Sequence, residues 1–194
     1  FSMQARNYST ISPSLGAGSL NVMVTAGMWA FVILCVLLLG YYRLSGVVAC
    51  IALLLQVSGQ LLALSVPQIT LTLPGIAGVI LSIGMGVDAN VIISERISEE
   101  IKGGKTPQQA IVVGFKNAFS SVFDGNITVM IVSIILMLLG SGSMLSFAYS
   151  LLTGVLLNFL AGVTASRLMM RSLVKYDLLA RPALYQSLSR RFVL

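Results

Sequence analysis

The chain has 194 residues, of which 57% are hydrophobic and 9% are charged, and its mean hydropathy is +0.96. Soluble domains carry roughly 25% charged residues, so this composition excludes an ordinary soluble domain and indicates a protein that lies in a bilayer. The net charge of +6 does not indicate nucleic-acid binding, because the basic residues sit beside apolar runs without interleaved aromatic residues that could stack on bases.

Catalytic and metal-binding residue types are scarce in this sequence. Cys35 and Cys50 lie inside apolar runs and the chain has no histidine, so we expect two free thiols, no disulfide and no metal site. The glycines of GMGVDA fall in a predicted membrane helix that a nucleotide could not reach, so we expect no cofactor and no enzyme activity. The chain begins at Phe1 without a signal-peptide pattern, and we expect it to be the downstream part of a longer protein.

Five apolar segments are long enough to cross a membrane. A helix that spans the ~30 Å hydrocarbon layer needs about 20 apolar residues. The pattern therefore predicts an all-α, polytopic bundle of transmembrane helices, with residues 1–20 before the first span and a basic tail over residues 170–194. The five predicted spans cover residues 21–42, 45–64, 73–94, 118–140 and 147–169.

The basic residues alternate with the predicted spans. Arginine and lysine stay on the cytoplasmic side of a membrane. The links after the second and fourth spans, SVPQIT and GSGSMLS, carry no charge, so the N-terminus is predicted outside and the C-terminus inside. The basic residues that follow the first, third and fifth spans are Arg43, Arg96, Lys102, Lys105, Lys116, Arg167, Arg171, Lys175, Arg181, Arg190 and Arg191.

The segment 95–117 between the third and fourth spans has its own helix signals. A charged helix end is followed by a break at Gly103 and Gly104, and then by Thr106 as N-cap with Pro107 at the first helical position. We expect an amphipathic helix on the inner membrane surface that leads into the fourth span. Its predicted apolar face consists of Ile111, Phe115, Ala118, Phe119 and Val122.

A single acid, Asp88, interrupts the apolar or small residues that run from Ile76 to Ile93. An aspartate near the centre of a membrane helix costs about 2.5 to 3.5 kcal/mol on insertion scales. Asp88 could make a buried polar contact that only holds helices together, or it could bind protons or ions. Intramembrane acids usually mark ion pathways, and burial favours the neutral carboxyl, so we favour a site that loads and releases a proton.

Further polar residues enter the fourth span. The apolar run 127–140 is too short to cross, so we expect the helix to extend back through Phe119. Gly125 could break this helix, which is tolerated within a membrane where neighbouring helices satisfy the freed backbone groups. The alternative is that Asp124 only caps a shorter helix at the surface. The extended span would include Asp124, Asn126 and Thr128.

The depths of these residues can be compared by counting along the chain from the outer helix ends. Asp88 lies as far from Pro74 as Asn126, on the antiparallel neighbour, lies from Gly140. Both are therefore about 21 Å deep at a rise of about 1.5 Å per residue. We expect a polar layer in which Asp88 lies among hydrogen-bond donors. Asp124, Thr128 and Asn90 fall within about one turn of that level.

Other small and polar residues in the spans are compatible with two interpretations. Gln56 and Gln60 on the second span, and Asn158 on the fifth, fit interhelical hydrogen bonding or a transport role equally well. Glycines on the third span indicate close helix packing, although sliding of such helices is also what a moving transporter requires. These glycines are Gly75, Gly78, Gly84 and Gly86.

Five stretches carry a family resemblance: LTLPGIAGVILSIGMGVDANVIISERI, GKTPQQAIVVGFKNAF, DGNIT, GSGSMLSFAYSL and TASR. From Thr10 to about Arg167 the chain closely resembles the membrane half of the SecD branch of the SecD/SecF family, which is related to the resistance-nodulation-division (RND) transporters. At the position where this chain has VDANVIISER, the SecF branch has a sequence that resembles VDTIVVFDR. The resemblance implies a six-span membrane domain, with the first span and a large extracytoplasmic domain upstream of Phe1.

The resemblance also implies a function. Such a subunit works with SecF beside the SecYEG channel in the bacterial cytoplasmic membrane, and uses the proton motive force to assist export of polypeptides that contact the outer domain. Protons would be the coupling ion. The motifs VDAN and D-x-N-x-T would then assign proton coupling to Asp88, Asn90, Asp124, Asn126 and Thr128.

Two alternatives to protein export remain at this point. The first is an RND-type exporter of small molecules or lipids. The second is a purely structural membrane scaffold, in which Asp88 would tolerate replacement by asparagine. Neither alternative involves covalent catalysis. In each, membrane lipids surround the spans.

Overall fold

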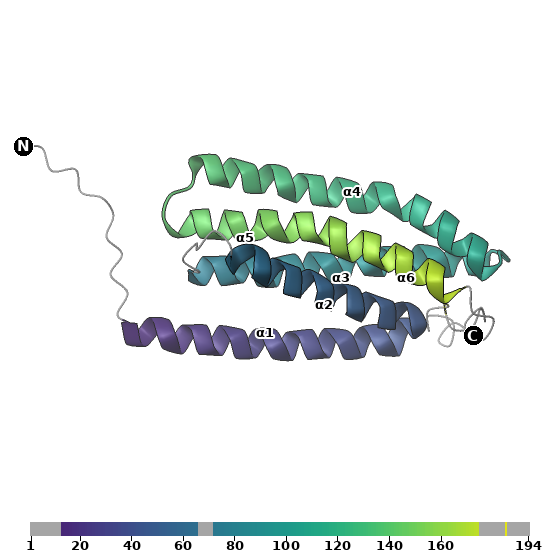
Figure 1. Ribbon diagram of the computed structural model, residues 1–194, viewed down its shortest axis with the longest axis horizontal. Helices are drawn as coiled ribbons and strands as arrows, with labels where there is room; N and C mark the ends of the chain where they lie inside the picture. The colour runs from purple at the N-terminus through teal and green to yellow at the C-terminus, as the bar shows by residue number, and fades with distance from the viewer. Residues whose placement is uncertain (1–12, 66–71, 175–184, 186–194) are drawn as a thin grey trace, which may run out of the picture.

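The computed structural model describes residues 13–65, 72–174 and 185. Over these residues the regular structure is entirely helical, and its long helices lie side by side in an antiparallel bundle (Figure 1). Five stretches are long and apolar enough to cross a membrane, which confirms the predicted all-α transmembrane bundle. The elements are α1 (Pro13–Tyr42), α2 (Leu44–Ser65), α3 (Leu73–Lys102), α4 (Pro107–Leu139), α5 (Ser143–Leu157), the π-helix η1 (Asn158–Ala165) and α6 (Ser166–Leu173).

Helix α1 lies at the edge of the bundle, where it contacts α2 and α3 (Figure 1). Its outward side chains, such as Met28 and Trp29, are exposed, as expected for a helix that faces lipid. Arg43 alone separates α1 from α2 and has a positive φ of 48°, which turns the chain sharply. Helix α1 already begins at Pro13, so the end of the expected lead-in, residues 13–20, is helical, and residues 1–12 lie outside the described part.

Helices α3 and α4 are longer than the sequence pattern predicts. Helix α3 continues to Lys102, and α4 is one uninterrupted helix from Pro107 that passes through Gly125. The helix that begins at Pro107 leads into the fourth span, as expected, but the two form one continuous helix, and residues 95–102 belong to the end of α3. Thr106 is the N-cap residue, as predicted, but its side chain makes no capping hydrogen bond.

The apolar face of the first part of α4 packs on protein instead of on the membrane surface. Ile111, Phe115, Ala118 and Val122 are buried in one cluster with residues of α3, while Phe119 is 51% exposed. Gly114 makes this packing possible, because a Cβ at that position would lie 2.9 Å from the Cα of Ile97. A hydrophobic face alone does not show whether its partner is lipid or another helix.

The predicted fifth span consists of α5, η1 and α6. The π-helix interrupts the regular helix over eight residues. Within it, the Thr164 hydroxyl donates to the Phe159 carbonyl five residues earlier at 3.1 Å. A π-helix widens the turn and shifts the following residues around the axis, and such segments occur frequently at functional sites. The basic tail predicted after this span lies mostly outside the described residues.

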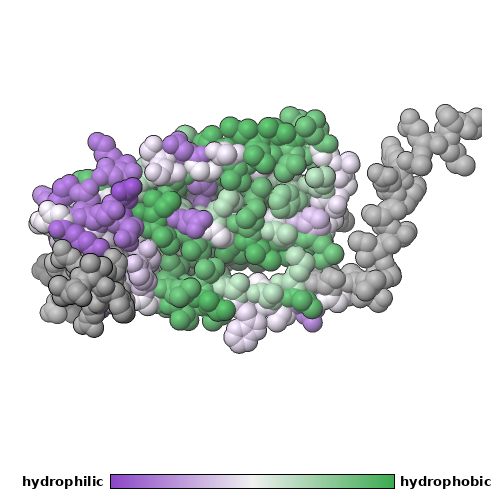
Figure 2. Space-filling model, turned by 180° about the vertical axis from the view of Figure 1, so that it is seen from behind, coloured by the Kyte–Doolittle hydropathy of each residue, from purple (hydrophilic) through white to green (hydrophobic). Residues whose placement is uncertain are grey.

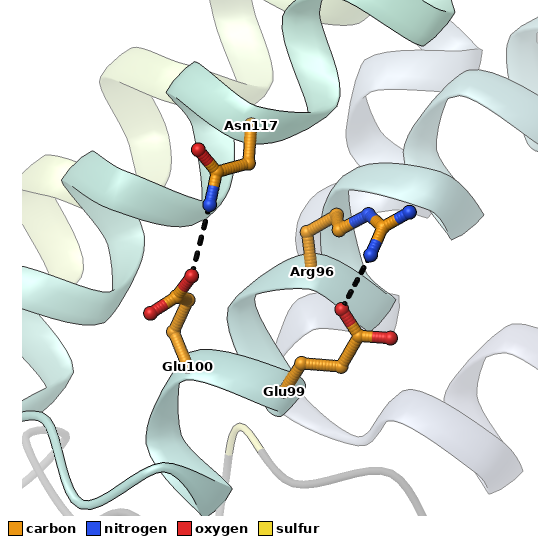
Figure 3. Close-up of polar contacts among 4 residues, drawn as sticks. All are labelled: Arg96, Glu99, Glu100 and Asn117. Carbon is orange, nitrogen blue, oxygen red and sulfur yellow. Dashed lines mark hydrogen bonds and ion pairs between the residues drawn. The ribbon is translucent and has the colours of Figure 1, made fainter.

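Charged side chains gather at the end of the bundle where α3 passes into α4, which we call the charged end. Figure 2 shows hydrophilic residues at this end and a hydrophobic band beside them. Arg96 and Glu99 form an ion pair at 2.8 Å on α3, and the Asn117 amide of α4 donates to Glu100 at 2.9 Å (Figure 3). This one-sided distribution agrees with the predicted alternation of the basic residues.

Candidate proton-binding site

Asp88 lies on an open face of α3, beside α4. Its side chain is exposed and lines a cavity of about 230 Å³, whose other walls include Met85, Ile92 and Val129. Asp88 makes no hydrogen bond or ion pair with the residues that the structure describes. Among the described residues, the site thus consists of one carboxyl group in a mostly apolar recess.

Asn126 lies at the same level as Asp88, as the depth comparison predicted. Both residues line the same cavity, one from α3 and one from α4. The Asn126 amide is engaged elsewhere, because its nitrogen donates to the Val122 carbonyl at 2.7 Å and its oxygen accepts from Asn158 at 3.0 Å. Asn126 therefore holds α4 to η1 at the depth of Asp88, instead of donating to the carboxylate.

Asp124 and Thr128 belong to α4, as the extended fourth span predicted. Asp124 lies well inside Pro107–Leu139, so the alternative that it caps a shorter helix at the surface is wrong. Both side chains are exposed, and neither lines the cavity beside Asp88. The Thr128 hydroxyl donates to the Asp124 carbonyl at 2.9 Å. The structure places these two residues on another side of α4 from Asn126.

Asn90 points away from Asp88. Two residues along a helix correspond to a rotation of about 200°, which places the two side chains on opposite faces of α3. Asn90 is 3% exposed, donates to the Gly86 carbonyl at 2.9 Å and accepts from the Ser166 hydroxyl at 2.7 Å. The expected layer of donors around Asp88 is therefore wrong in its geometry. Helical periodicity could have revealed this, whereas nothing in the sequence identified Ser166 as the partner.

Several other intramembrane polar groups form hydrogen bonds between helices. Gln56 donates to the Ser82 carbonyl at 3.0 Å, and Gln60 donates to the Ser150 carbonyl at 2.9 Å. The Ser82 hydroxyl contacts the Gln60 oxygen at 2.7 Å. With Asn126–Asn158 and Asn90–Ser166, these contacts join α2, α3, α4, α5, η1 and α6. Each of these buried amides thus makes at least one interhelical hydrogen bond, and we call these contacts the buried polar network.

The glycines of α3 do not all serve packing. A Cβ at Gly75 or Gly86 would collide with a side chain of α5 or α2, and one at Gly78 would be tightly packed against α5, which confirms close helix approach there. Gly84 differs, because nothing lies within 4 Å of a Cβ at that position. Cys35 and Cys50 are free, and the Cys50 thiol lies 3.8 Å from the Cys35 carbonyl. The described residues include no cluster of three or more potential metal ligands.

Comparisons with known proteins identify relatives of this chain. The protein export membrane protein SecD/SecF, C-terminal family matches residues 1–176. The protein translocase subunit SecD of Haemophilus influenzae is 41% identical over 84% of this chain and 27% of its own length. The SecD subunit of Synechocystis is 40% identical over 90% of this chain and 37% of its own length. The chain therefore spans only about a third of these relatives.

Solved structures that are similar to this chain come from the same family as these relatives. The crystal structure of SecDF from Thermus thermophilus, described as a translocon-associated membrane protein, superposes with a TM-score of 0.82 and 33% identity over 86% of this chain and 23% of that one. A second SecDF structure, in the form called super-membrane-facing, gives a TM-score of 0.79 at 33% identity over 84% of this chain and 22% of that one. In sequence and in fold, the chain belongs to the SecD/SecF family of protein-export membrane proteins.

Proposed function

We propose that this chain is the membrane part of an accessory subunit of the Sec protein translocase, which uses the proton motive force to assist export of polypeptides. The observation that carries this proposal is the intramembrane carboxyl of Asp88, which faces an open cavity between α3 and α4 without a partner in the described chain. The relatives named above are protein translocase subunits, which favours polypeptides over small molecules or lipids as the exported substrate.

Asp88 is the proton carrier in this proposal. A charged carboxylate is costly in hydrocarbon, so protonation changes how favourably the face of α3 that carries Asp88 packs against a neighbour. A charge that crosses the membrane potential releases about 2.3 kcal/mol per 100 mV. Repeated loading and release would therefore couple the proton motive force to a change in helix packing, with protons as the only coupling ion.

The other four candidate residues support Asp88 in different ways. Asn126 and Asn90 fix α4 and α3 to η1 and α6 through their hydrogen bonds, and so position the cavity walls. We propose that Asp124 and Thr128, which are exposed on α4, act in the assembled complex instead of within this chain. In this proposal all four residues contribute to proton coupling indirectly, and Asp88 alone carries the proton.

We propose that SecF, as a separate chain or a fused half, covers the cavity and supplies the group that faces Asp88. An exposed acid within a membrane span needs a partner, and the described residues supply none. The complex would lie beside SecYEG in the bacterial cytoplasmic membrane. The N-terminus of this chain would lie outside, toward a domain that contacts the exported polypeptide, and the charged end would lie inside.

Replacement of Asp88 by asparagine tests the proposal. In the full-length subunit with its partners, we expect Asp88→Asn to abolish the part of secretion that depends on the proton gradient, because the amide cannot carry the proton. Inverted membrane vesicles with and without an uncoupler measure this part directly. Asp88→Glu, which keeps a titratable group, should retain part of it.

Glu99→Gln is the matched control, because it removes one acid from α3 at an exposed position in an ion pair with Arg96. We expect Glu99→Gln to leave gradient-dependent secretion unchanged. If Asp88→Asn vesicles retain full gradient-dependent secretion at normal subunit levels, the proton-carrier role is excluded and the structural scaffold is favoured.

A further inference from the structure

A basic groove runs between α4 and the η1–α6 segment at the charged end. It comprises two neighbouring cavities of about 340 and 510 Å³ along the same two stretches of helix. Lys116 and Arg167 line the first cavity, and Arg171 lines the second, one turn further along α6. The described residues that line the groove include no acid, so the charged side chains among them are all basic.

The three basic side chains are available for an external anion. Lys116, Arg167 and Arg171 are exposed, and none forms an ion pair with the residues that the structure describes. Two acids of α3 at this end are engaged elsewhere, since Glu99 pairs with Arg96 and Glu100 binds Asn117 (Figure 3). Glu100 also pairs with Lys105. These pairings leave the groove without a counter-charge from that part of α3.

The depth of the groove matches the lipid headgroups. Along the chain, Lys116 is as far from the outer end of α4 at Gly140 as Arg167 is from the start of α5 at Ser143. At about 1.5 Å per residue, Lys116 is about 36 Å from the outer end of α4, beyond a hydrocarbon core of ~30 Å but within a bilayer of about 40 to 45 Å. Arg167 lines the same cavity and therefore lies near that level. Two cations from separate helices therefore meet at the level of the phosphates.

Aromatic side chains continue the groove toward the membrane centre. Phe119 and Phe159 line the cavity together with Lys116 and Arg167. Phe123 stacks on Phe119 and meets Phe159 edge-on, each with ring centroids 5.7 Å apart. Phe159 and Thr164 are five residues apart in the π-helix, and both line this cavity. The result is a cationic end with an apolar wall beside it.

We propose that this groove binds an anionic phospholipid, with its phosphate at Lys116 and Arg167 and its acyl chains along Phe119 and Phe159. Basic pockets between helices at the cytoplasmic surface are suited to acidic lipid headgroups. A free phosphate would use the cations alone, whereas a lipid also covers the exposed aromatic wall. The site is separate from the Asp88 cavity and does not depend on the proton-coupling role.

Lipid binding to the full-length subunit with its partners tests this site. Native mass spectrometry from detergent, with phosphatidylglycerol and phosphatidylcholine supplied at equal concentration, measures the occupancy of each. We expect phosphatidylglycerol to bind preferentially. Lys116→Gln with Arg167→Gln should lower its affinity roughly 30-fold, since each basic residue near anionic lipid contributes about a fivefold gain.

Two control variants separate the site from general charge and from misfolding. Lys105→Gln removes one cation from the same end but outside the groove, and should leave phosphatidylglycerol binding unchanged. Lys116→Arg with Arg167→Lys keeps both charges and should retain binding. Asp88→Asn should also bind lipid normally, so failure of the proton-coupling proposal would be distinguishable from failure of this one.

Several outcomes would overturn the lipid site. Equal binding of the two lipids, undiminished binding by the double glutamine variant, or an equal loss in Lys105→Gln would each exclude it. If glycerol phosphate displaces the bound lipid at equal concentration, the groove is a phosphate site and not a lipid site. A cross-link from the Phe119→Cys variant to a partner subunit, with no lipid bound, would show that protein covers the groove.

Discussion

The two faces of α3 differ in whether their polar side chains are buried and hydrogen-bonded. One face carries Ser82, Gly86 and Asn90, which are buried and contact α2 and α6. The other face presents Asp88 to the cavity beside α4, exposed and without a partner in the described chain. Within one helix, a buried polar network and an unpaired acid lie only two residues apart.

This contrast separates stability from the proposed coupling. A polar group in hydrocarbon needs a partner within the protein, and the Ser82–Asn90 face meets that requirement inside this chain. The Asp88 face does not, so its insertion cost remains without a local compensating contact. Substitutions in the buried polar network should therefore change the free energy of unfolding, and substitutions at Asp88 should change transport.

The largest effect on stability is expected from Gly154→Ala. A Cβ at Gly154 would overlap the Cβ of Ser82 and lie 2.8 Å from the Gln60 nitrogen, so α5 would have to move away from α3. Overpacking of this kind typically costs about 1 to 3 kcal/mol. Unfolding of the full-length subunit in detergent, followed by circular dichroism, measures the loss.

Gly84→Ala is the matched control on α3. Nothing lies within 4 Å of a Cβ at Gly84, and alanine favours the helix over glycine by up to about 1 kcal/mol. We expect unchanged or slightly higher stability. Equal losses in Gly154→Ala and Gly84→Ala would contradict the difference between the two faces, because they would show that both are packed.

A smaller loss is expected from Asn158→Ala, which removes the hydrogen bond to the Asn126 oxygen. Interhelical hydrogen bonds in membrane proteins contribute about 0.6 kcal/mol on average and at most about 1.7 kcal/mol. We expect a loss of about 1 kcal/mol in the same measurement, since both residues are buried. Thr153→Val is the control, because the Thr153 hydroxyl bonds only within its own helix, at 2.9 Å to Tyr149 and 3.0 Å to Ser150. A loss from Thr153→Val as large as that from Asn158→Ala would show that the network adds nothing between helices.

Length and hydropathy predicted the membrane helices and the relative depth of the site. Counting residues from the outer helix ends placed Asp88 and Asn126 at one level, and both line one cavity. This succeeded because the rise per residue of a straight helix is constant, and because short links force neighbouring helices to be antiparallel.

Side-chain direction and helix irregularity were harder to predict. Depth says nothing about rotation, so Asn90 was expected near Asp88 although it faces Ser166. No residue pattern in Asn158–Ala165 predicted that this segment would be a π-helix. The partner of the apolar face around Phe115 was also ambiguous, because lipid and protein favour the same residues.

The smallest effect on stability is expected from Asp88→Asn, the same variant that should abolish gradient-dependent secretion. No hydrogen bond or ion pair to the described residues is lost, so the free energy of unfolding should stay within about 0.5 kcal/mol of the unmodified subunit. A loss as large as that from Asn158→Ala would mean that Asp88 has a structural partner, and its effect on secretion could then follow from lower subunit abundance. Normal stability with lost coupling would instead assign Asp88 to transport, because the fold would be intact while the carboxyl group that carries the proton is missing.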